Sequence, residues 1–66
     1  MLITANGKEL DISPGTTIHG FLESRGIKPG TVVIEYNHNL PPKESWPEII
    51  LNEGDNLEVI KMMGGG

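Results

Sequence analysis

The apolar and polar positions of the first twelve residues predict a β-hairpin. Asn6 and Gly7 suit a type I′ turn, because both central residues of that turn need a positive φ. Leu10 and Ile12 alternate with charged residues, so one face of the second strand should be buried. If the first strand alternates in the same way, Leu2 and Thr4 lie on its other face. This alternation directs three residues inward: Met1, Ile3 and Ala5.

The segment after the hairpin has helical spacing. Thr16 or Thr17 can cap a helix that runs to about Arg25, and Gly26 is suited to end it. The apolar residues at i, i+3 and i+4 form one stripe, which we assign to the core rather than to a cofactor site. They are Ile18, Phe21 and Leu22.

A β-branched run over residues 31–36 predicts the third strand. If Glu35 faces water, Val33 shares its face. Val32, Ile34 and Tyr36 then point inward. Residues 37–39 should turn the chain, and Leu40 is expected to begin a short edge strand that the following prolines interrupt.

The second half of the chain predicts one helical turn and a last strand. The turn spans 43–46 and ends before Pro47, with Trp46 as a lid over the core rather than a binding platform. More core is expected from Ile49, Ile50 and Leu51. After a turn over 52–55, residues 56–60 read as the last strand.

This order of elements predicts a mixed sheet. Two opening strands are followed by a crossover helix, which should lie across one face of the sheet. A last strand in the centre of the sheet would then lie beside the first strand and run parallel to it. That arrangement is an α+β fold of the ubiquitin-like β-grasp type, with four or five strands. We expect one β-grasp domain over residues 1–63 and a flexible reactive tail over residues 64–66.

Composition excludes several kinds of chemistry. The chain has 66 residues, three aromatic residues and no cysteine, so the expected core is mostly aliphatic and a thiol nucleophile is excluded. His19 and His38 lack metal-ligand spacing. A net charge of −4 argues against nucleic acid as a partner, and no apolar run has transmembrane length. We therefore expect a cytoplasmic protein with no bound metal.

The glycines at the C-terminus are the strongest candidates for chemistry. Gly64, Gly65 and Gly66 have no side chains to bury, but a chain without Cβ atoms can thread a narrow tunnel. The carboxylate of Gly66 is unhindered and can attack an electrophile such as the α-phosphorus of a nucleotide. The alternative is a frayed chain end without function.

A docking surface is expected beside this tail. If Leu57 and Val59 point at the helix, Ile60 and Met62 emerge on the helix-free face. There Ile60 should lie near Val33 and, less directly, near Leu2. Isolated exposed aliphatic residues are ordinary, but a cluster that leads to a reactive tail favours a partner surface.

The chain resembles the ubiquitin-like sulfur-carrier proteins, and among them the ThiS family of thiamine biosynthesis. Three features carry the resemblance: Asn37 ahead of Pro42, Lys43 and Trp46; Gly54 and Asp55 before the last strand; and Gly65-Gly66 at the end. The family commonly has Arg where Lys43 stands, and Pro41 is an additional proline.

The resemblance implies a mechanism and partners. A ThiF-like adenylating enzyme would use ATP to activate the carboxylate of Gly66, and a sulfur donor protein would displace AMP to leave a thiocarboxylate. Thiazole synthase (ThiG-like) would then take the sulfur into thiazole. The chain would be a carrier and co-substrate rather than an enzyme, with no permanently bound cofactor.

Other assignments remain open on the sequence alone. The small subunit of molybdopterin synthase shares the fold, tail and chemistry but has a different acceptor, and a carrier for another pathway is also possible. A ubiquitin-like protein modifier and an interaction module with an inert tail belong to different functional classes.

Overall fold

The computed structural model describes residues 1–62, and its elements are named here in chain order. Strands β1 and β2 are followed by helix α1, and strand β3 is separated from strand β4 by a short helical segment. The bounds are β1 Leu2–Ala5, β2 Lys8–Asp11, α1 Ile18–Ser24, η1 Pro29–Thr31, β3 Val32–Tyr36, η2 Lys43–Glu48 and β4 Asn56–Lys61, where η marks a 3₁₀ helix.

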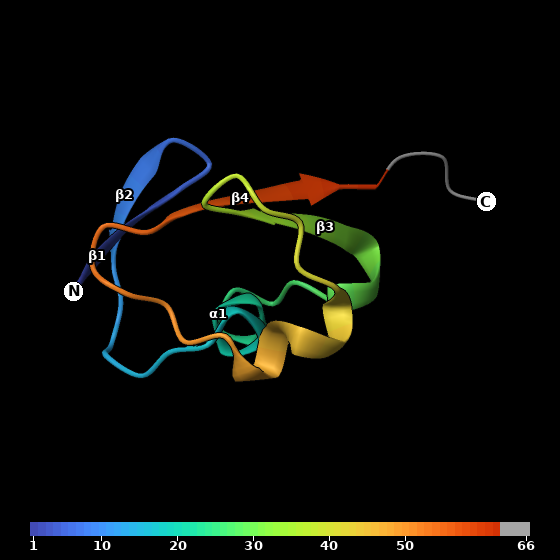
Figure 1. The fold of residues 1–66 in the computed structure, drawn as a ribbon, viewed down its shortest axis with the longest axis horizontal. Coiled ribbons are helices and arrows are strands. Elements are labelled where there is room, and N and C mark those ends of the chain that lie inside the picture. The colour runs from blue at the N-terminus through green and yellow to red at the C-terminus, as the bar shows by residue number, and fades with distance from the viewer. Residues whose placement is uncertain (63–66) are drawn as a thin grey trace.

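The four strands form one mixed sheet in the order β2-β1-β4-β3. Strand β4 is parallel to β1 and antiparallel to β3, while β1 and β2 form the antiparallel hairpin. Helix α1 and η2 lie on the same side of the sheet, and no helix of residues 1–62 covers its other side (Figure 1). The predicted β-grasp, with the last strand in the centre, is therefore confirmed.

Inward-facing residues of the sheet, helix and η2 form a single core between these layers. The buried apolar residues are Ile3, Ala5, Ile18, Phe21, Leu22, Val32, Ile34, Trp46, Leu51 and Leu57. Met1, Tyr36 and Val59 pack against the core as partly buried residues. The strand parities predicted from the sequence are correct, and Trp46 is part of the core as expected.

Helix α1 begins and ends where its capping residues predict. The Thr17 hydroxyl accepts a hydrogen bond from the backbone N–H of Gly20 at 2.9 Å, which satisfies one free donor of the first turn. Arg25 is the C-cap, and Gly26 follows at a φ of +72°. The left-handed conformation of Gly26 ends the helix without the strain that a side chain would add.

The hairpin turn also has the predicted geometry. Asn6 and Gly7 both have positive φ, at 51° and 81°. A second turn of the same kind follows β3, because Asn37 and His38 have φ values of 48° and 72°. The backbone groups of Tyr36 and Asn39 bond to each other across it, at 2.7 and 2.9 Å.

Three local predictions are wrong. Leu40 begins no strand, because pairing beyond this turn stops at a single bridge between Tyr36 and Asn39. The helical turn does not end before Pro47 but continues to Glu48, since the fixed φ of proline is compatible with a 3₁₀ helix. Ile50 is exposed, because in this extended segment successive side chains point to opposite sides.

Candidate functional site

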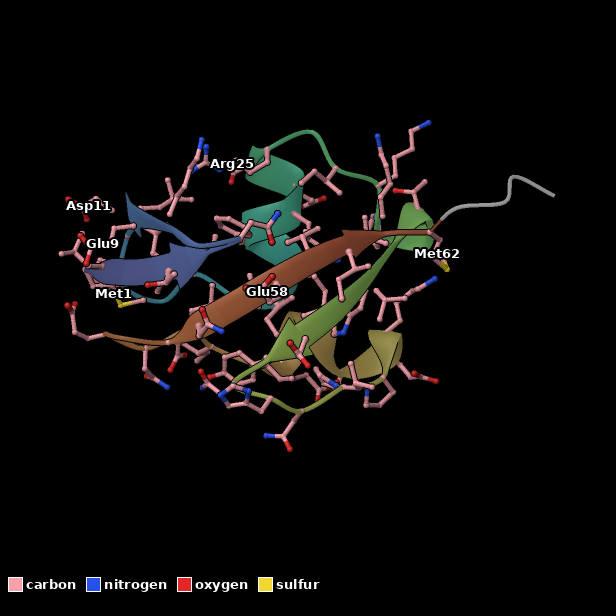
Figure 2. The ribbon with its side chains drawn as sticks, turned by 90° about the horizontal axis from the view of Figure 1, so that it is seen from above. Met1, Glu9, Asp11, Arg25, Glu58 and Met62 are labelled. Atoms are coloured by element: carbon pink, nitrogen blue, oxygen red, sulfur yellow. The ribbon has the colours of Figure 1, made fainter. Side chains whose placement is uncertain are left out.

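The candidate site is the end of β4 that leads to the C-terminal glycines. Met62 follows β4 and donates its backbone N–H to the carbonyl of Thr31 at 3.0 Å. Met62 lies at the opposite end of the molecule from Met1, Glu9 and Asp11 (Figure 2). The predicted roles of Gly64, Gly65 and Gly66 concern residues outside the described range, and so does the predicted domain boundary at residue 63.

The predicted docking residues lie together on the helix-free face of the sheet. Val33 and Ile60 are direct cross-strand partners, so their Cβ atoms are about 5 Å apart. Met62 lies two residues further along the same face. All three side chains are exposed, at 38%, 49% and 51% for Val33, Ile60 and Met62. We call these three residues the apolar patch.

Leu2 does not extend the apolar patch, so this part of the expectation is wrong. The parallel register sets Ala5 beside Leu57, and the Leu2 carbonyl accepts a hydrogen bond from the N–H of Gly54 at 2.8 Å. Leu2 therefore lies near the start of β4, while Ile60 lies near its end. Parity alone assigned both residues to one face but could not place them along it.

The side chain of Asn6 extends the sheet beside the end of β4. Its Oδ1 accepts the backbone N–H of Val59 at 2.7 Å, and its Nδ2 donates to the Val59 carbonyl at 3.4 Å. Backbone pairing between β1 and β4 ends at Leu57. Two residues further along β4, the side-chain amide of Asn6 bonds to Val59 in place of a strand backbone. This contact holds β4 extended close to the tail.

The start of β4 is held by a buried carboxylate. Asp55 is only 8% exposed, yet the hydroxyl of Tyr36, the backbone N–H of Asn52 and Nδ2 of Asn37 all donate to it. The distances from these donors are 2.7, 2.7 and 3.2 Å. Asn37 also accepts the N–H of Asn56 at 2.8 Å, so the turn after β3 is tied to β4. We call this set the Asp55 network.

These contacts shift the pKa values of two groups. Burial would raise the pKa of Asp55, but the hydrogen bonds from Tyr36, Asn52 and Asn37 outweigh it and hold that pKa below its ordinary value. The hydrogen bond to the Asp55 carboxylate raises the pKa of the Tyr36 hydroxyl. Every donor is used within the fold, so the Asp55 network is a structural site rather than a reactive one.

Other possible sites receive little support. His19 lies within 3.6 Å of a Glu23 carboxylate oxygen on the exposed side of α1. Residues 1–62 contain no cluster of three or more side chains that could hold a metal ion. No helix in the same part of the chain could span a membrane.

Sequence reasoning used Asn37 and Asp55 as turn residues and as parts of the family resemblance, and it missed their joint role in the structure. The available signal was Tyr36, which was predicted to point inward and whose hydroxyl would then need a partner. The contact of Asn6 with Val59 carries no comparable signal, because it joins residues 53 positions apart.

Comparison with known proteins decides between the families left open by the sequence. A family model described as the ThiS family matches residues 2–66. The chain belongs to the ThiS family. The sulfur carrier protein ThiS of Bacillus subtilis is 30% identical over 66 residues, which cover 98% of this chain and 100% of the relative.

Solved structures and a larger relative agree with this assignment. The crystal structure of a thiamine biosynthesis protein (ThiS) from Geobacter metallireducens matches with a TM-score of 0.86 at 25% identity, covering 100% of both chains. A thiazole synthase of Paramagnetospirillum magneticum is 33% identical over 66 residues. This chain spans only 20% of that relative's length.

Membership of the ThiS family confirms the resemblance found in the sequence. The family includes relatives named sulfur carrier protein, such as the one from Bacillus subtilis. Two residues that carry the resemblance, Asn37 and Asp55, belong to the structural network at the start of β4.

Proposed function

We propose that the carboxylate of Gly66 is the group on which this carrier transports sulfur. A ThiF-like enzyme adenylates it: a carboxylate oxygen attacks the α-phosphorus of ATP, and pyrophosphate leaves. Sulfide then attacks the acyl carbon and displaces AMP, which leaves a thiocarboxylate. When a donor protein carries the sulfur as a persulfide, the attack forms an acyl disulfide, and a second thiol cleaves its S–S bond to release the thiocarboxylate. Adenylation is needed because a free carboxylate is stabilised by resonance and is a poor acyl donor.

The observation that carries this proposal is the position of the apolar patch at the base of the tail. Four residues follow Met62, and a fully extended chain of that length spans at most about 14 Å. An enzyme that binds the Gly66 carboxylate in an enclosed site must therefore approach the domain surface around Met62 closely. Val33 and Ile60 give that surface an exposed apolar centre of the kind that partner proteins use.

Thiazole synthase is proposed as the enzyme that consumes the sulfur. The relative from Paramagnetospirillum magneticum, named thiazole synthase, contains a stretch similar to this whole chain. A carrier-like segment within such a protein is what a direct partnership between carrier and synthase would favour. Molybdopterin synthesis, the closest alternative, has no comparable support.

The test is the intact mass of the protein after incubation with a ThiF-like enzyme, ATP and a sulfur source. Replacement of one carboxylate oxygen by sulfur adds about 16 Da, the difference between the two atomic masses. Deletion of Gly66 should abolish this product, because the carboxylate of the shortened chain would end about 3.5 Å short of the reacting phosphorus. The deletion should not unfold the domain, since the core lies within residues 3–57.

Two results would overturn the assignment. One is a thiocarboxylate on the shortened chain at the rate of the parent. The other is a parent chain that gains no sulfur although a ThiS protein from another organism is converted by the same enzymes.

A further inference from the structure

A second surface lies at the base of the tail, on the helix side of the sheet. It is a groove of about 500 Å³ lined by residues 26–28, Thr31, Val32, Val59 and Lys61. Its apolar lining comes from Ile27, Val32 and Val59. These three residues also belong to the core or pack against it. The exposed Lys28 and Lys61 border it.

The groove and the apolar patch occupy opposite faces of the same strand. Val59 and Lys61 alternate with Ile60 along β4, so their side chains point to the helix side. Helix α1 ends at Ser24, and none of its residues lines the groove, which is bordered instead by the loop after α1 and by Thr31 of η1. The tail therefore leaves the domain between an apolar surface and the groove.

Positive charge gathers at this groove in a chain whose net charge is −4. No carboxylate lines it, and neither Lys28 nor Lys61 forms an ion pair with another residue in 1–62. Nζ of Lys43 lies 3.9 Å from the position that a Cβ on Gly30 would take, and Gly30 precedes Thr31 of the groove lining. The acidic residues Glu9 and Asp11 lie at the other end of the molecule (Figure 2).

The length of the tail determines which part of a partner meets these lysines. Five residues follow Lys61, so its backbone lies at most about 18 Å from the reactive carboxylate. An extended tail in a tunnel approaches that limit, so the lysines stay outside the tunnel. They would contact the rim of the partner's site and not the phosphates of its nucleotide.

We propose that this groove is a docking site for the rim of the adenylating enzyme, which supplies an apolar side chain flanked by carboxylates. The inference rests on the proposed function, because it takes the enzyme that encloses the tail as the occupant. A tunnel surrounds the chain that enters it, so the enzyme contacts both faces of β4. The apolar patch provides one contact, and the groove provides the other with opposite charge.

The test compares charge reversals in two places. Lys28→Glu and Lys61→Glu should each weaken binding to a ThiF-like enzyme about fivefold to tenfold, since each replaces an attraction by a repulsion at the interface. Lys8→Glu makes the same change in net charge on strand β2, which β1 separates from β4, at a residue that does not line the groove, and should alter binding less than twofold. Affinity is measured by calorimetry, so it does not depend on turnover.

Thiocarboxylate formation is followed in parallel. The reversals in the groove should raise KM for the carrier and leave kcat within about twofold, because the reacting groups are unchanged. Equal affinities of Lys61→Glu, Lys28→Glu and Lys8→Glu would overturn the docking site. A parent that binds the enzyme but gains no sulfur would overturn the proposed function alone, and the affinities of the variants would still decide the groove.

Chemical cross-linking gives an independent result. A carbodiimide couples lysine amines to carboxylates in direct contact, so mass spectrometry of the complex should find Lys28 or Lys61 joined to Asp or Glu of the enzyme. Cross-links that occur only at Lys8, or a parent that does not bind the enzyme at all, would overturn the inference.

Discussion

The two ends of β4 differ in how they are held. At its start, Asn56 and Leu57 have β1 on one side, Leu57 pairs with Tyr36 on the other, and the Asp55 network closes the end. At its far end the strand pairs only with β3, up to the partners Val32 and Lys61, and Asn6 supplies the contact on the open side.

This difference places the residues that stabilise the fold at one end of β4 and the residues available for recognition at the other end. Polar groups at the start of β4 have their partners inside the molecule, so they stabilise the fold and leave nothing for a ligand. Ile60, Lys61 and Met62 at the far end are exposed, so their side chains are accessible to another protein. The proposed carrier function needs both properties in one strand, because a rigid base would limit the conformational entropy that is lost when a tail enters a partner.

The largest effect on stability is expected from Asp55→Ala. The substitution leaves the Tyr36 hydroxyl and two other donors without their buried acceptor, at a cost of about 3 kcal/mol of unfolding free energy. Chemical denaturation measures this value. Glu53→Ala is the matched control and should cost less than 1 kcal/mol, because within residues 1–62 its exposed carboxylate accepts a single hydrogen bond, from the N–H of Leu2.

An Asp55→Ala protein as stable as its control would show that the two ends of β4 do not differ as described. Binding of the folded fraction to a ThiF-like enzyme should be close to that of the parent, since the Asp55 network lies at the other end of the strand.

The largest effect on recognition is expected from Ile60→Asp. A charge at the centre of the apolar patch should lower activation about thirtyfold, which corresponds to about 2 kcal/mol of binding free energy. The unfolding free energy should change by about 0.5 kcal/mol or less. Leu2→Asp is the control, because Leu2 has similar exposure on the same face but lies at the other end of the sheet. Equal activation of the two variants would remove the apolar patch as a docking surface.

Gly65→Val tests whether the activating enzyme binds the tail in a tunnel too narrow for a side chain. A β-branched residue is bulky at Cβ and avoids positive φ, so activation should fall well over tenfold, with Gly65→Ala in between. Thermal stability should match the parent. The rate of exchange between ATP and pyrophosphate in the presence of the activating enzyme measures the effect, and equal rates for all three proteins would exclude a tunnel at this position.

Acid should destabilise the domain through Asp55. Its pKa is lower in the folded protein than the ordinary value of 3.8, so its contribution to stability is present above that value. As the pH falls below 3.8, the unfolded chain takes up the proton first, and the contribution is lost by the time the folded carboxyl is protonated. Thermal unfolding between pH 6 and about pH 2 should therefore show a weaker pH dependence in Asp55→Asn than in the parent.

The smallest effect is expected at Asn6. Asn6→Gly keeps the positive φ of the turn but removes the amide, at a cost of about 1 kcal/mol. Hydrogen exchange of the Val59 N–H should become faster. Asn6→Asp keeps the acceptor oxygen and should preserve protection of that N–H, so faster exchange in both variants would show that the side chain does not hold the end of β4.

The sequence by itself determined most of the local structure. Asn6-Gly7 specifies the hairpin turn, Thr17 and Gly26 specify the ends of α1, and period-two alternation specifies the inward faces of the strands. These features depend on neighbouring residues, so their physical causes lie within a few positions of the chain. The matching family pattern and the terminal glycines also indicated a sulfur carrier without any structure.

Only the tertiary structure decided which distant residues meet. Parity placed Leu2 and Ile60 on one face, but the register between β1 and β4 puts them at opposite ends of the sheet. The side chain of Asn6 bonds to Val59, which is 53 positions away in the chain. Hydrogen bonds from Tyr36 and Asn37 to Asp55 join the turn after β3 to the turn before β4. Lys28 and Lys61 share a groove for the same reason. Register and crossover are set by packing of the whole core, and no local pattern contains that information.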